Sequence, residues 1–270
     1  MFADTEKEDN RRKWTLDEFE KAWNEVLESE NFNPKEIYRV QLTSGRTKTF
    51  HEEGYGEMLP KTFHNIALQT KLKEKKKVKN RNVPKWFLDI GSGIGNVVNL
   101  VAYTTLATCV GVEIHIARSK LASNLSMLMD EKRREKDTNK GIASKDQRHV
   151  HISLYTGDGF LLEPALNVFD VIFANNLLFD EAMNQRLFRM IGERCKEGTL
   201  LVVTKLTYDK EIIGKYFTIP KLGKDLDHID KVEEKYFKKS GPIENTFRKF
   251  EGEGSWTGKS VPYYITKVTK

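Results

Sequence analysis

The sequence predicts an α/β protein in which a mostly parallel sheet, covered by helices on both faces, follows a helical lobe at the N-terminus. Two observations support this prediction. From Pro84 onwards, short apolar runs alternate with amphipathic segments across short turns, which is the order expected of a parallel sheet. The first apolar run ends in a glycine-rich turn at Gly91–Gly95, the place where such sheets approach their ligands. The 270 residues, 39% of them hydrophobic, suffice for one large core.

The N-terminal lobe, residues 1–83, is predicted to be helical and basic. Thr15–Glu18 has the spacing of a capping box, and apolar residues recur at helical spacing after it. A second helix is expected at about 60–73. The alternation of apolar runs and amphipathic segments begins near residue 83, so residues 84–270 are predicted to form the main domain.

Alternating strands and helices are predicted within the main domain. The strands are expected at 86–90, 109–113, 149–155, 171–175 and 199–204, and the helices at 96–105, 115–136 and 180–194. After Thr204 the pattern weakens until a late strand at 263–268.

The net charge of +6 is concentrated in one segment. Lys71–Arg81 holds seven basic residues and one acidic residue, so the rest of the chain is neutral. A solvated helix end followed by a loop is one interpretation of this segment. An anionic partner such as nucleic acid, or a nuclear import signal, is equally compatible with it.

The cysteine content and the apolar runs exclude several classes of protein. Cys109 and Cys195 fit a reducing compartment, and their separation matches no zinc pattern, so we expect no metal site. No apolar run has the length of a membrane span. The N-terminus is polar, unlike a secretory signal. We expect a monomer, because the sequence has no coiled-coil pattern.

Three motifs at predicted strand ends indicate an adenosine site. The turn after the first strand, Asp89–Gly95, can bring backbone close to a ligand. Glu113 ends the second strand and can accept hydrogen bonds from ribose hydroxyls. Asp158 follows the third strand and can accept from an adenine amino group, while Phe160 can cover the base. The plainer alternatives are a solvent-exposed strand-end carboxylate and an ordinary glycine turn.

The glycine-rich motif has the order Asp-x-Gly-x-Gly-x-Gly, which resembles the first motif of seven-stranded, Rossmann-like class I methyltransferases that use S-adenosylmethionine. This resemblance covers roughly residues 84–204. Amino methyltransferases of nucleic acid often carry Asn/Asp-Pro-Pro-aromatic after the fourth strand. Residues 175–179 instead read NNLLF, without prolines.

Four separated motifs resemble one family within this class. They are GYGEMLP at 54–60, DIGSGIGNVV at 89–98, NNLLF at 175–179 and GSWTGKSVPYY at 254–264. Together they are similar to the disruptor-of-telomeric-silencing family of histone-lysine methyltransferases. Those enzymes lack a SET fold and modify a lysine on the folded core of histone H3 within the nucleosome, which implies a nuclear protein. The segment 207–253 does not align with the family pattern.

The resemblance implies roles for individual residues. The loop that closes over the methionine part of the cofactor is expected to contain Tyr55, Gly56 and Glu57. The residues expected to cradle the cofactor, including its ribose and adenine, are Asp89, Gly91, Gly93, Asn96, Glu113, Asp158 and Phe160. The lysine channel is expected to be lined by Asn175, Phe179, Trp256 and Tyr263, with Asn175 also beside the cofactor methyl. The alternative for Trp256 and Tyr263 is hydrophobic core with a satisfied hydroxyl.

These roles lead to a hypothesis for the reaction. The Asn175 amide accepts from the lysine amine and orients it, apolar walls favour the neutral amine, and no general base is essential. Asn176 is interpreted as satisfying backbone groups. Lys71–Arg81 is a candidate contact for nucleosomal DNA. An RNA or DNA amino methyltransferase, and a non-catalytic chromatin-binding module, are the competing interpretations.

Overall fold

The computed structural model describes residues 13–29, 60–79, 81–143, 147, 149–207, 209–218, 248–253 and 260–270. Four predicted site residues lie outside these ranges, namely Tyr55, Gly56, Glu57 and Trp256. Within the described residues, no helix is long and apolar enough to cross a membrane.

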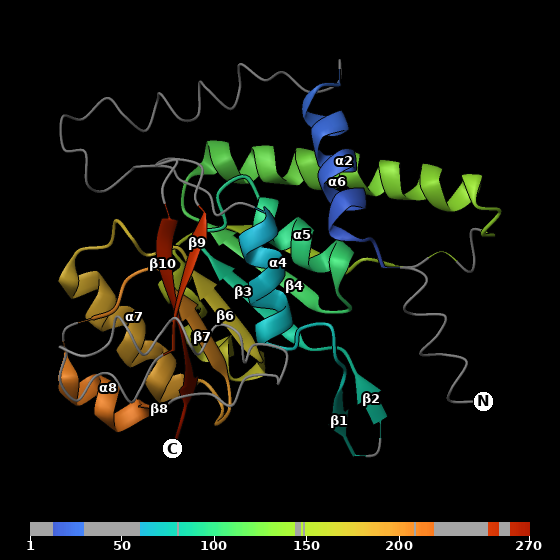
Figure 1. The fold of residues 1–270 in the computed structure, drawn as a ribbon. Coiled ribbons are helices and arrows are strands. Elements are labelled where there is room, and N and C mark those ends of the chain that lie inside the picture. Colours follow the sequence, from blue (N-terminus) through green and yellow to red (C-terminus); the bar gives the residue numbers. More distant parts are fainter. Residues whose placement is uncertain are drawn as a thin grey trace.

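A large mixed sheet forms the centre of the molecule (Figure 1). Its strands are β3 (Trp86–Ile90), β4 (Thr108–Glu113), β5 (Ile152–Thr156), β6 (Val171–Ala174), β7 (Leu200–Val203), β8 (Phe217–Thr218), β9 (Arg248–Glu253) and β10 (Ser260–Val268). Seven of them follow the order β5-β4-β3-β6-β7-β10-β8, and β9 pairs with β10. Strands β3 to β7 are parallel, whereas β10 runs antiparallel to its neighbours β7, β8 and β9. The parallel sheet predicted from the sequence is therefore confirmed.

Helices cover both faces of the sheet. One face carries α4 (Pro60–Gln69), α5 (Asn96–Thr104) and α6 (Ile116–Asn139), with α2 (Leu16–Leu27) lying across α5 and α6 (Figure 1). The other face carries the 3-10 helix η2 (Gly159–Val168), α7 (Glu181–Arg194) and α8 (Lys210–Tyr216). All four residues of β6 are buried, as are the last four of β3, because a parallel sheet with helices on both sides leaves neither face to solvent.

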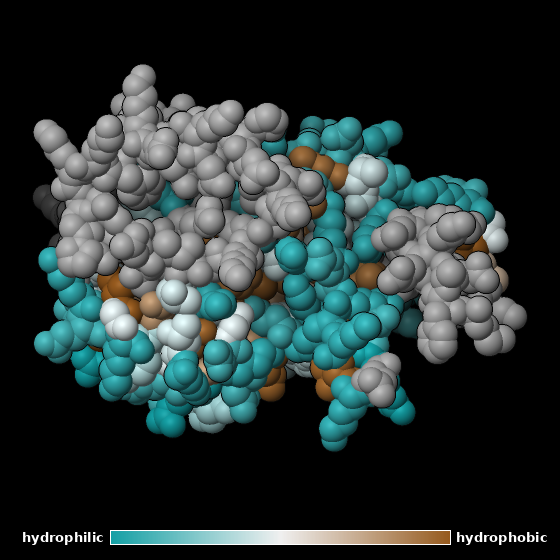
Figure 2. Space-filling view, turned by 60° about the horizontal axis from the view of Figure 1, so that its bottom comes forward, coloured by the Kyte–Doolittle hydropathy of each residue, from teal (hydrophilic) through white to brown (hydrophobic). Residues whose placement is uncertain are grey.

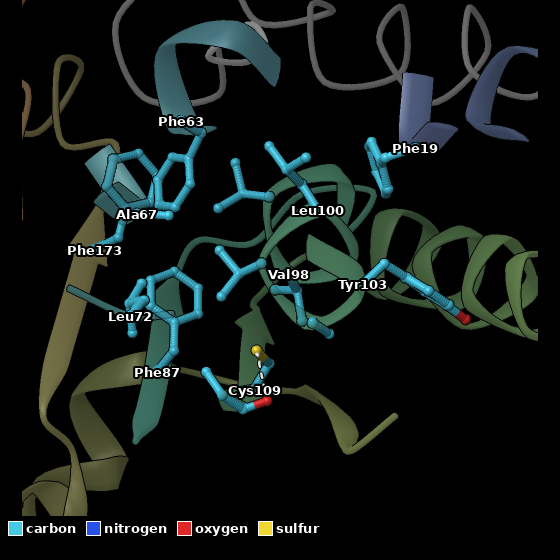
Figure 3. Packing of buried hydrophobic residues seen from close by; sticks show 14 of the residues in the cluster. Phe19, Phe63, Ala67, Leu72, Phe87, Val98, Leu100, Tyr103, Cys109 and Phe173 are labelled. Carbon is cyan, nitrogen blue, oxygen red and sulfur yellow. Dashed lines mark hydrogen bonds between the residues drawn. The ribbon is translucent and has the colours of Figure 1, made fainter. Parts of the chain in front are cut away.

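The helices of the N-terminal lobe share a hydrophobic core with the sheet domain (Figure 3). Phe63 of α4 makes edge-to-face contacts with Phe87 and Phe173, at ring-centre distances of 5.6 and 4.8 Å. Trp14, just before α2, stacks on Tyr103 of α5 at 4.9 Å. The capping box predicted at the start of α2 is confirmed. Helix α4 ends at Gln69, four residues earlier than predicted.

The basic segment divides into two parts: residues 71–75 form a turn and connection after the end of α4, as one interpretation expected, and the rest belongs to a β-hairpin. Strands β1 (Lys76–Val78) and β2 (Arg81–Val83) pair antiparallel and project from the body of the molecule (Figure 1). In the space-filling view the tip of the projection is mainly hydrophilic (Figure 2), although Val78 of β1 is also exposed. Its base is fixed by Asp170, which accepts from Lys76 Nζ at 2.6 Å and from the Trp86 backbone N–H at 2.8 Å. The Nζ atom of Lys196 also contacts Asp170, at 2.7 Å.

Replacing Asp170 with asparagine is expected to destabilise the protein in a pH-dependent way. Burial alone would raise the pKa of Asp170, but hydrogen bonds from Lys196, Lys76 and the Trp86 N–H outweigh it and lower that pKa. A carboxylate with a lowered folded pKa adds stability above its unfolded pKa, and that stability is lost as the pH falls through the folded pKa. We expect Asp170→Asn to reduce the free energy of unfolding at pH 7 by about 1–2 kcal/mol.

Urea denaturation of both proteins between pH 7 and pH 3 measures this effect. The difference between wild type and Asp170→Asn should shrink once the pH falls below about 4. Glu197→Gln, at an exposed carboxylate next to Lys196, is the control and should change little. A difference that is the same at every pH contradicts the assigned role of the Asp170 charge.

Candidate active site

The glycine-rich turn connects β3 to α5 at the carboxyl edge of the sheet. Gly91, Gly93 and Gly95 have φ values of +79°, +56° and +80°, a region that glycine adopts without steric cost. The Gly91 N–H donates to the Val112 carbonyl at 2.8 Å, which fixes the turn to β4. A Cβ on Gly91 would meet no atom within 4 Å, whereas one on Gly95 would lie 3.2 Å from Ala122 Cβ. Gly91 thus faces open space that a ligand can occupy, and Gly95 allows α5 to pack against α6.

Glu113 at the end of β4 joins this turn to the next element. Its side chain is only 3% exposed, so the solvent-exposed alternative is wrong. Its Oε2 accepts from the Gly93 N–H at 2.9 Å, and its Oε1 accepts from the His115 N–H at 2.8 Å. Arg118 of α6 donates to Oε1 from both Nε and Nη2, at 3.1 and 2.9 Å. The structure therefore brings Gly93 and Glu113 together, as predicted, and adds Arg118, which sequence reasoning missed.

The loop after β5 lies at the same edge of the sheet. The Gly157 N–H donates to the Glu113 carbonyl at 2.9 Å, so this loop lies beside β4. Asp158 Oδ1 accepts from the Phe160 N–H at 2.9 Å and thereby caps η2. A Cβ on Gly159 would lie 2.8 Å from Ile90 Cγ2, so a glycine is needed for this close approach.

Phe160 lies mostly inside the protein. Its side chain is 8% exposed and belongs to the core on the α7 face. The Arg186 guanidinium lies 4.2 Å from the centre of its ring. The large apolar side chains that are exposed next to Glu113 and Phe160 are Ile114, at 66%, and Leu161, at 75%.

Two further predicted cofactor residues are buried at the start of this edge. Asp89 lies in β3 and is 2% exposed, and Asn96 is the first residue of α5 and is 9% exposed. The Asn96 Oδ1 accepts from the neighbouring Val97 N–H at 2.6 Å, and the N-cap position of the helix is held by Gly95. Among the described residues no group of three or more His, Cys, Asp or Glu side chains could hold a metal ion.

A second set of polar side chains lies where β6, β7 and β10 meet the same edge. Ala174 of β6 and Tyr264 of β10 both pair with Val203 of β7. Asn175, Thr204 and Tyr263 are the next residues towards the edge on these three strands. The Thr204 hydroxyl donates to Asn175 Oδ1 at 3.0 Å.

Tyr263 is fixed from the helical lobe. It is 2% exposed, and its hydroxyl donates to Oε1 of Gln69, the last residue of α4, at 3.0 Å. Burial raises the pKa of Tyr263 well above the ordinary value of a phenol. The side chain is therefore neutral at physiological pH. Sequence reasoning identified Tyr263 and Asn175 but missed Gln69 and Thr204.

Asn176 has a different role from its neighbour Asn175. It is fully buried, and its Oδ1 accepts from the backbone N–H groups of Thr204 and Lys205 at 2.9 and 3.0 Å. Its Nδ2 donates to the Lys205 carbonyl and to Asn184 Oδ1, both at 2.7 Å. The interpretation that Asn176 satisfies backbone groups is confirmed.

Phe179 ends the turn that Asn176 holds. Its N–H donates to the Asn176 carbonyl at 3.1 Å, and its own carbonyl accepts from Lys205 Nζ at 2.6 Å. The Phe179 ring is half-buried against the core on the α7 face. The turn is therefore attached to β7 through both Asn176 and Lys205.

Strand order, glycine-rich turn and buried carboxylate together define the class I, Rossmann-like fold of S-adenosylmethionine-dependent methyltransferases. The model of one family within it, described as the histone methylation protein DOT1, matches residues 40–268. The chain belongs to this DOT1 family, which confirms the resemblance seen in its motifs.

The curated relatives are described as histone-lysine N-methyltransferases specific for H3 lysine-79. The protein of Caenorhabditis elegans is 27% identical over 82% of this chain and 20% of its own length. That of Debaryomyces hansenii is 26% identical over 82% of this chain and 16% of its own length. That of Yarrowia lipolytica is 25% identical over 83% of this chain and 39% of its own length. The chain thus spans well under half the length of these relatives.

Proposed function

We propose that this chain transfers a methyl group from S-adenosylmethionine to a lysine on the folded core of histone H3 in the nucleosome. The observation that carries the proposal is that two sets of residues share one edge of the sheet in a chain of the DOT1 family. One set contains Gly93 and Glu113, and the other contains Asn175, Thr204 and Tyr263. The names of the curated relatives support the choice of substrate.

The first set fits the proposed cofactor. Open space in front of Gly91 admits a ligand at the carboxyl edge, and Glu113 lies directly behind the turn. When bound, the cofactor supplies a methyl group that its sulfonium makes electrophilic. In the proposal its holders are Asp89, Gly91, Gly93, Asn96, Glu113 and Asp158, with Phe160 supporting the adenine loop from inside and the loop of Tyr55, Gly56 and Glu57 closing over it.

The second set provides for the acceptor amine. A lysine with a pKa of about 10.4 must lose a proton to react, which costs roughly 4 kcal/mol near pH 7.4. Apolar surroundings offset part of this cost because they disfavour the ammonium form. In the proposal these surroundings are Phe179, Trp256 and the neutral ring of Tyr263. The proton leaves to solvent, and no residue of this set is a carboxylate or a histidine.

Asn175 orients the amine in this proposal. Its Oδ1 accepts from the Thr204 hydroxyl. In the proposal the same oxygen also accepts from the N–H of the substrate amine, since a carbonyl oxygen has two lone pairs. Holding the amine in line with the sulfur–methyl bond lets the nitrogen–methyl bond form as the sulfur–methyl bond breaks.

Labelled methyl transfer to four acceptors tests the proposed function. Nucleosomes, free histone H3, RNA and DNA are each offered with labelled S-adenosylmethionine. We expect label on histone H3 in nucleosomes. Label in RNA or DNA supports a nucleic-acid amino methyltransferase instead. Cofactor binding without transfer to any acceptor supports a non-catalytic chromatin-binding module.

We also propose that the β1–β2 hairpin contacts nucleosomal DNA. Lys77, Lys79 and Arg81 are exposed on the projection, whereas Lys76 is engaged by Asp170. Exposed cations of this kind neutralise backbone phosphates. Under this proposal the chain acts in the nucleus, as a monomer. Residues 1–83 then form a lobe that carries both this contact and the loop that closes over the cofactor.

Reversing the hairpin charges is expected to weaken nucleosome binding. The variant carries Lys77→Glu, Lys79→Glu and Arg81→Glu. We expect at least about a tenfold loss of affinity at moderate salt. The slope of log affinity against log salt concentration should also become shallower, by an amount that corresponds to the loss of up to about three phosphate contacts. Electrophoretic mobility shifts at several salt concentrations measure both quantities. Affinity for S-adenosylhomocysteine should not change.

A matched variant tests whether the effect is local. Lys21, Lys120 and Lys210 are exposed on α2, α6 and α8, and replacing them with glutamate makes the same change in net charge. This control should bind nucleosomes more tightly than the hairpin variant. Equal weakening by both variants, or unchanged affinity of the hairpin variant, contradicts a DNA contact at the hairpin.

A further inference from the structure

A buried ion pair lies behind the nucleoside end of the site. Glu113 is 3% exposed and Arg118 is 9% exposed. Two N–H groups of the guanidinium reach the same carboxylate oxygen, Oε1, at 3.1 and 2.9 Å. Burying two charges is costly unless they are paired and further hydrogen-bonded. The carboxylate of this pair meets that condition, since backbone N–H groups of His115 and Gly93 also donate to it.

The hydrogen bonds are distributed unequally over the two carboxylate oxygens. Oε1 accepts from Arg118 twice and from the His115 N–H once, whereas Oε2 accepts from the Gly93 N–H. An ionised carboxylate has about four lone-pair positions in all. The remaining acceptor capacity of Glu113 is therefore on Oε2, the oxygen beside the glycine-rich turn.

We propose that Arg118 is a positioning residue for nucleoside recognition. By holding Oε1, it fixes the rotation of the carboxylate and presents Oε2 to the ligand, so that Glu113 accepts from one ribose hydroxyl rather than from two. This inference rests on the proposed cofactor. It adds that the two hydroxyls of the ribose contribute unequally to binding, and that Arg118 sets this inequality without touching the ligand.

Analogues that lack one hydroxyl separate positioning from simple support of the fold. Binding of S-adenosylhomocysteine and of its 2′-deoxy and 3′-deoxy analogues is measured by calorimetry. For the wild type we expect one analogue to bind at least about tenfold more weakly than the parent compound, and the other to lose less than about threefold.

Two variants of Arg118 give the decisive comparison. Arg118→Met should bind S-adenosylhomocysteine at least about tenfold more weakly than the wild type does. The analogue that the wild type binds about tenfold more weakly should bind Arg118→Met and the wild type about equally, because it lacks the hydroxyl that Glu113 contacts. Arg118→Lys keeps the charge but not the two-pronged geometry, so an intermediate effect is expected. Its milder change also guards against loss of folding in the methionine variant.

A matched arginine on the same helix is the control. Arg133 is 7% exposed and pairs with Asp130 and Asp137, at 2.9 Å in each case. Arg133→Lys should leave the discrimination between analogues unchanged. Equal loss for all three ligands in the Arg118 variants, or equal sensitivity of the wild type to both deletions, overturns the inference. Failure of the wild type to bind S-adenosylhomocysteine at all contradicts the proposed function instead.

Discussion

Replacing Asn175 with alanine is expected to reduce kcat for lysine methylation by about 100-fold or more, with less than about a threefold change in the Kd of S-adenosylhomocysteine. The reason is the position of this amide at the carboxyl end of β6, where its oxygen accepts from the Thr204 hydroxyl and, in the proposed reaction, also from the substrate amine. Without it the amine binds in many orientations, few of them in line with the methyl group. Single-turnover kinetics on nucleosomes and calorimetry with S-adenosylhomocysteine measure the two effects separately.

Two further variants connect this result to the geometry. Thr204→Val preserves shape but removes the hydroxyl that fixes the amide, so we expect the same loss in kcat on a smaller scale, restored by Thr204→Ser. Asn175→Asp keeps the acceptor atoms, but a carboxylate there favours the ammonium form of the lysine. The rate of its chemical step should therefore reach its plateau at a higher pH. Turnover by Asn175→Ala equal to that of the wild type would show that this residue does not orient the acceptor.

Asn176→Ala is expected to lower the free energy of unfolding by about 3–5 kcal/mol, a far larger effect on stability than Asn175→Ala. The fully buried amide of Asn176 serves two backbone N–H groups, one carbonyl and the side chain of Asn184. Removing it leaves these groups inside the protein without that partner, and each such group costs free energy. Urea denaturation at pH 7, followed by circular dichroism, measures the change.

Asn184→Ala is the graded comparison for this experiment. This substitution removes one buried hydrogen bond to Asn176 and a longer one, 3.3 Å, to the Phe179 carbonyl. The free energy of unfolding is therefore expected to fall by about 1–2 kcal/mol. If Asn176→Ala stays within about 1 kcal/mol of the wild type, the network does not hold the turn between β6 and α7. The assignment of a structural role to Asn176, distinct from the proposed catalytic role of Asn175, would then be wrong.

The sequence predicted the sheet and the edge that carries the site because both depend on local patterns. Apolar runs such as Val171–Ala174 indicate buried strands, and parallel strands place the residues that follow them at one edge. The edge positions of Gly93 and Glu113 could therefore be predicted from local pattern, whereas Asn175 and Tyr263 were assigned to the site through the family resemblance. The burial of Phe160 could not be predicted, because it depends on how Gly159 packs against Ile90.

Residues that act through partners distant in the sequence could not be predicted in this way. Arg118 reads as one more polar position on a charged helix until Glu113 is seen beside it. Gln69 and Tyr263 are 194 residues apart. The β1–β2 hairpin carries lysines instead of the alternating apolar residues that indicate a strand, and its base is fixed by Asp170, which follows it by almost a hundred residues.

The hairpin and the residues proposed to orient the acceptor lie at opposite ends of the parallel strands. Asp170, which holds the hairpin, immediately precedes β6, and Asn175 immediately follows it. Five residues of extended chain separate them by roughly 17 Å. A short histone peptide can occupy only one of these ends, whereas a particle in which the target lysine and a DNA gyre are held rigidly apart can engage both. Under the proposed function, a preference for the assembled particle over its isolated pieces would come from the distance between the two ends of the sheet.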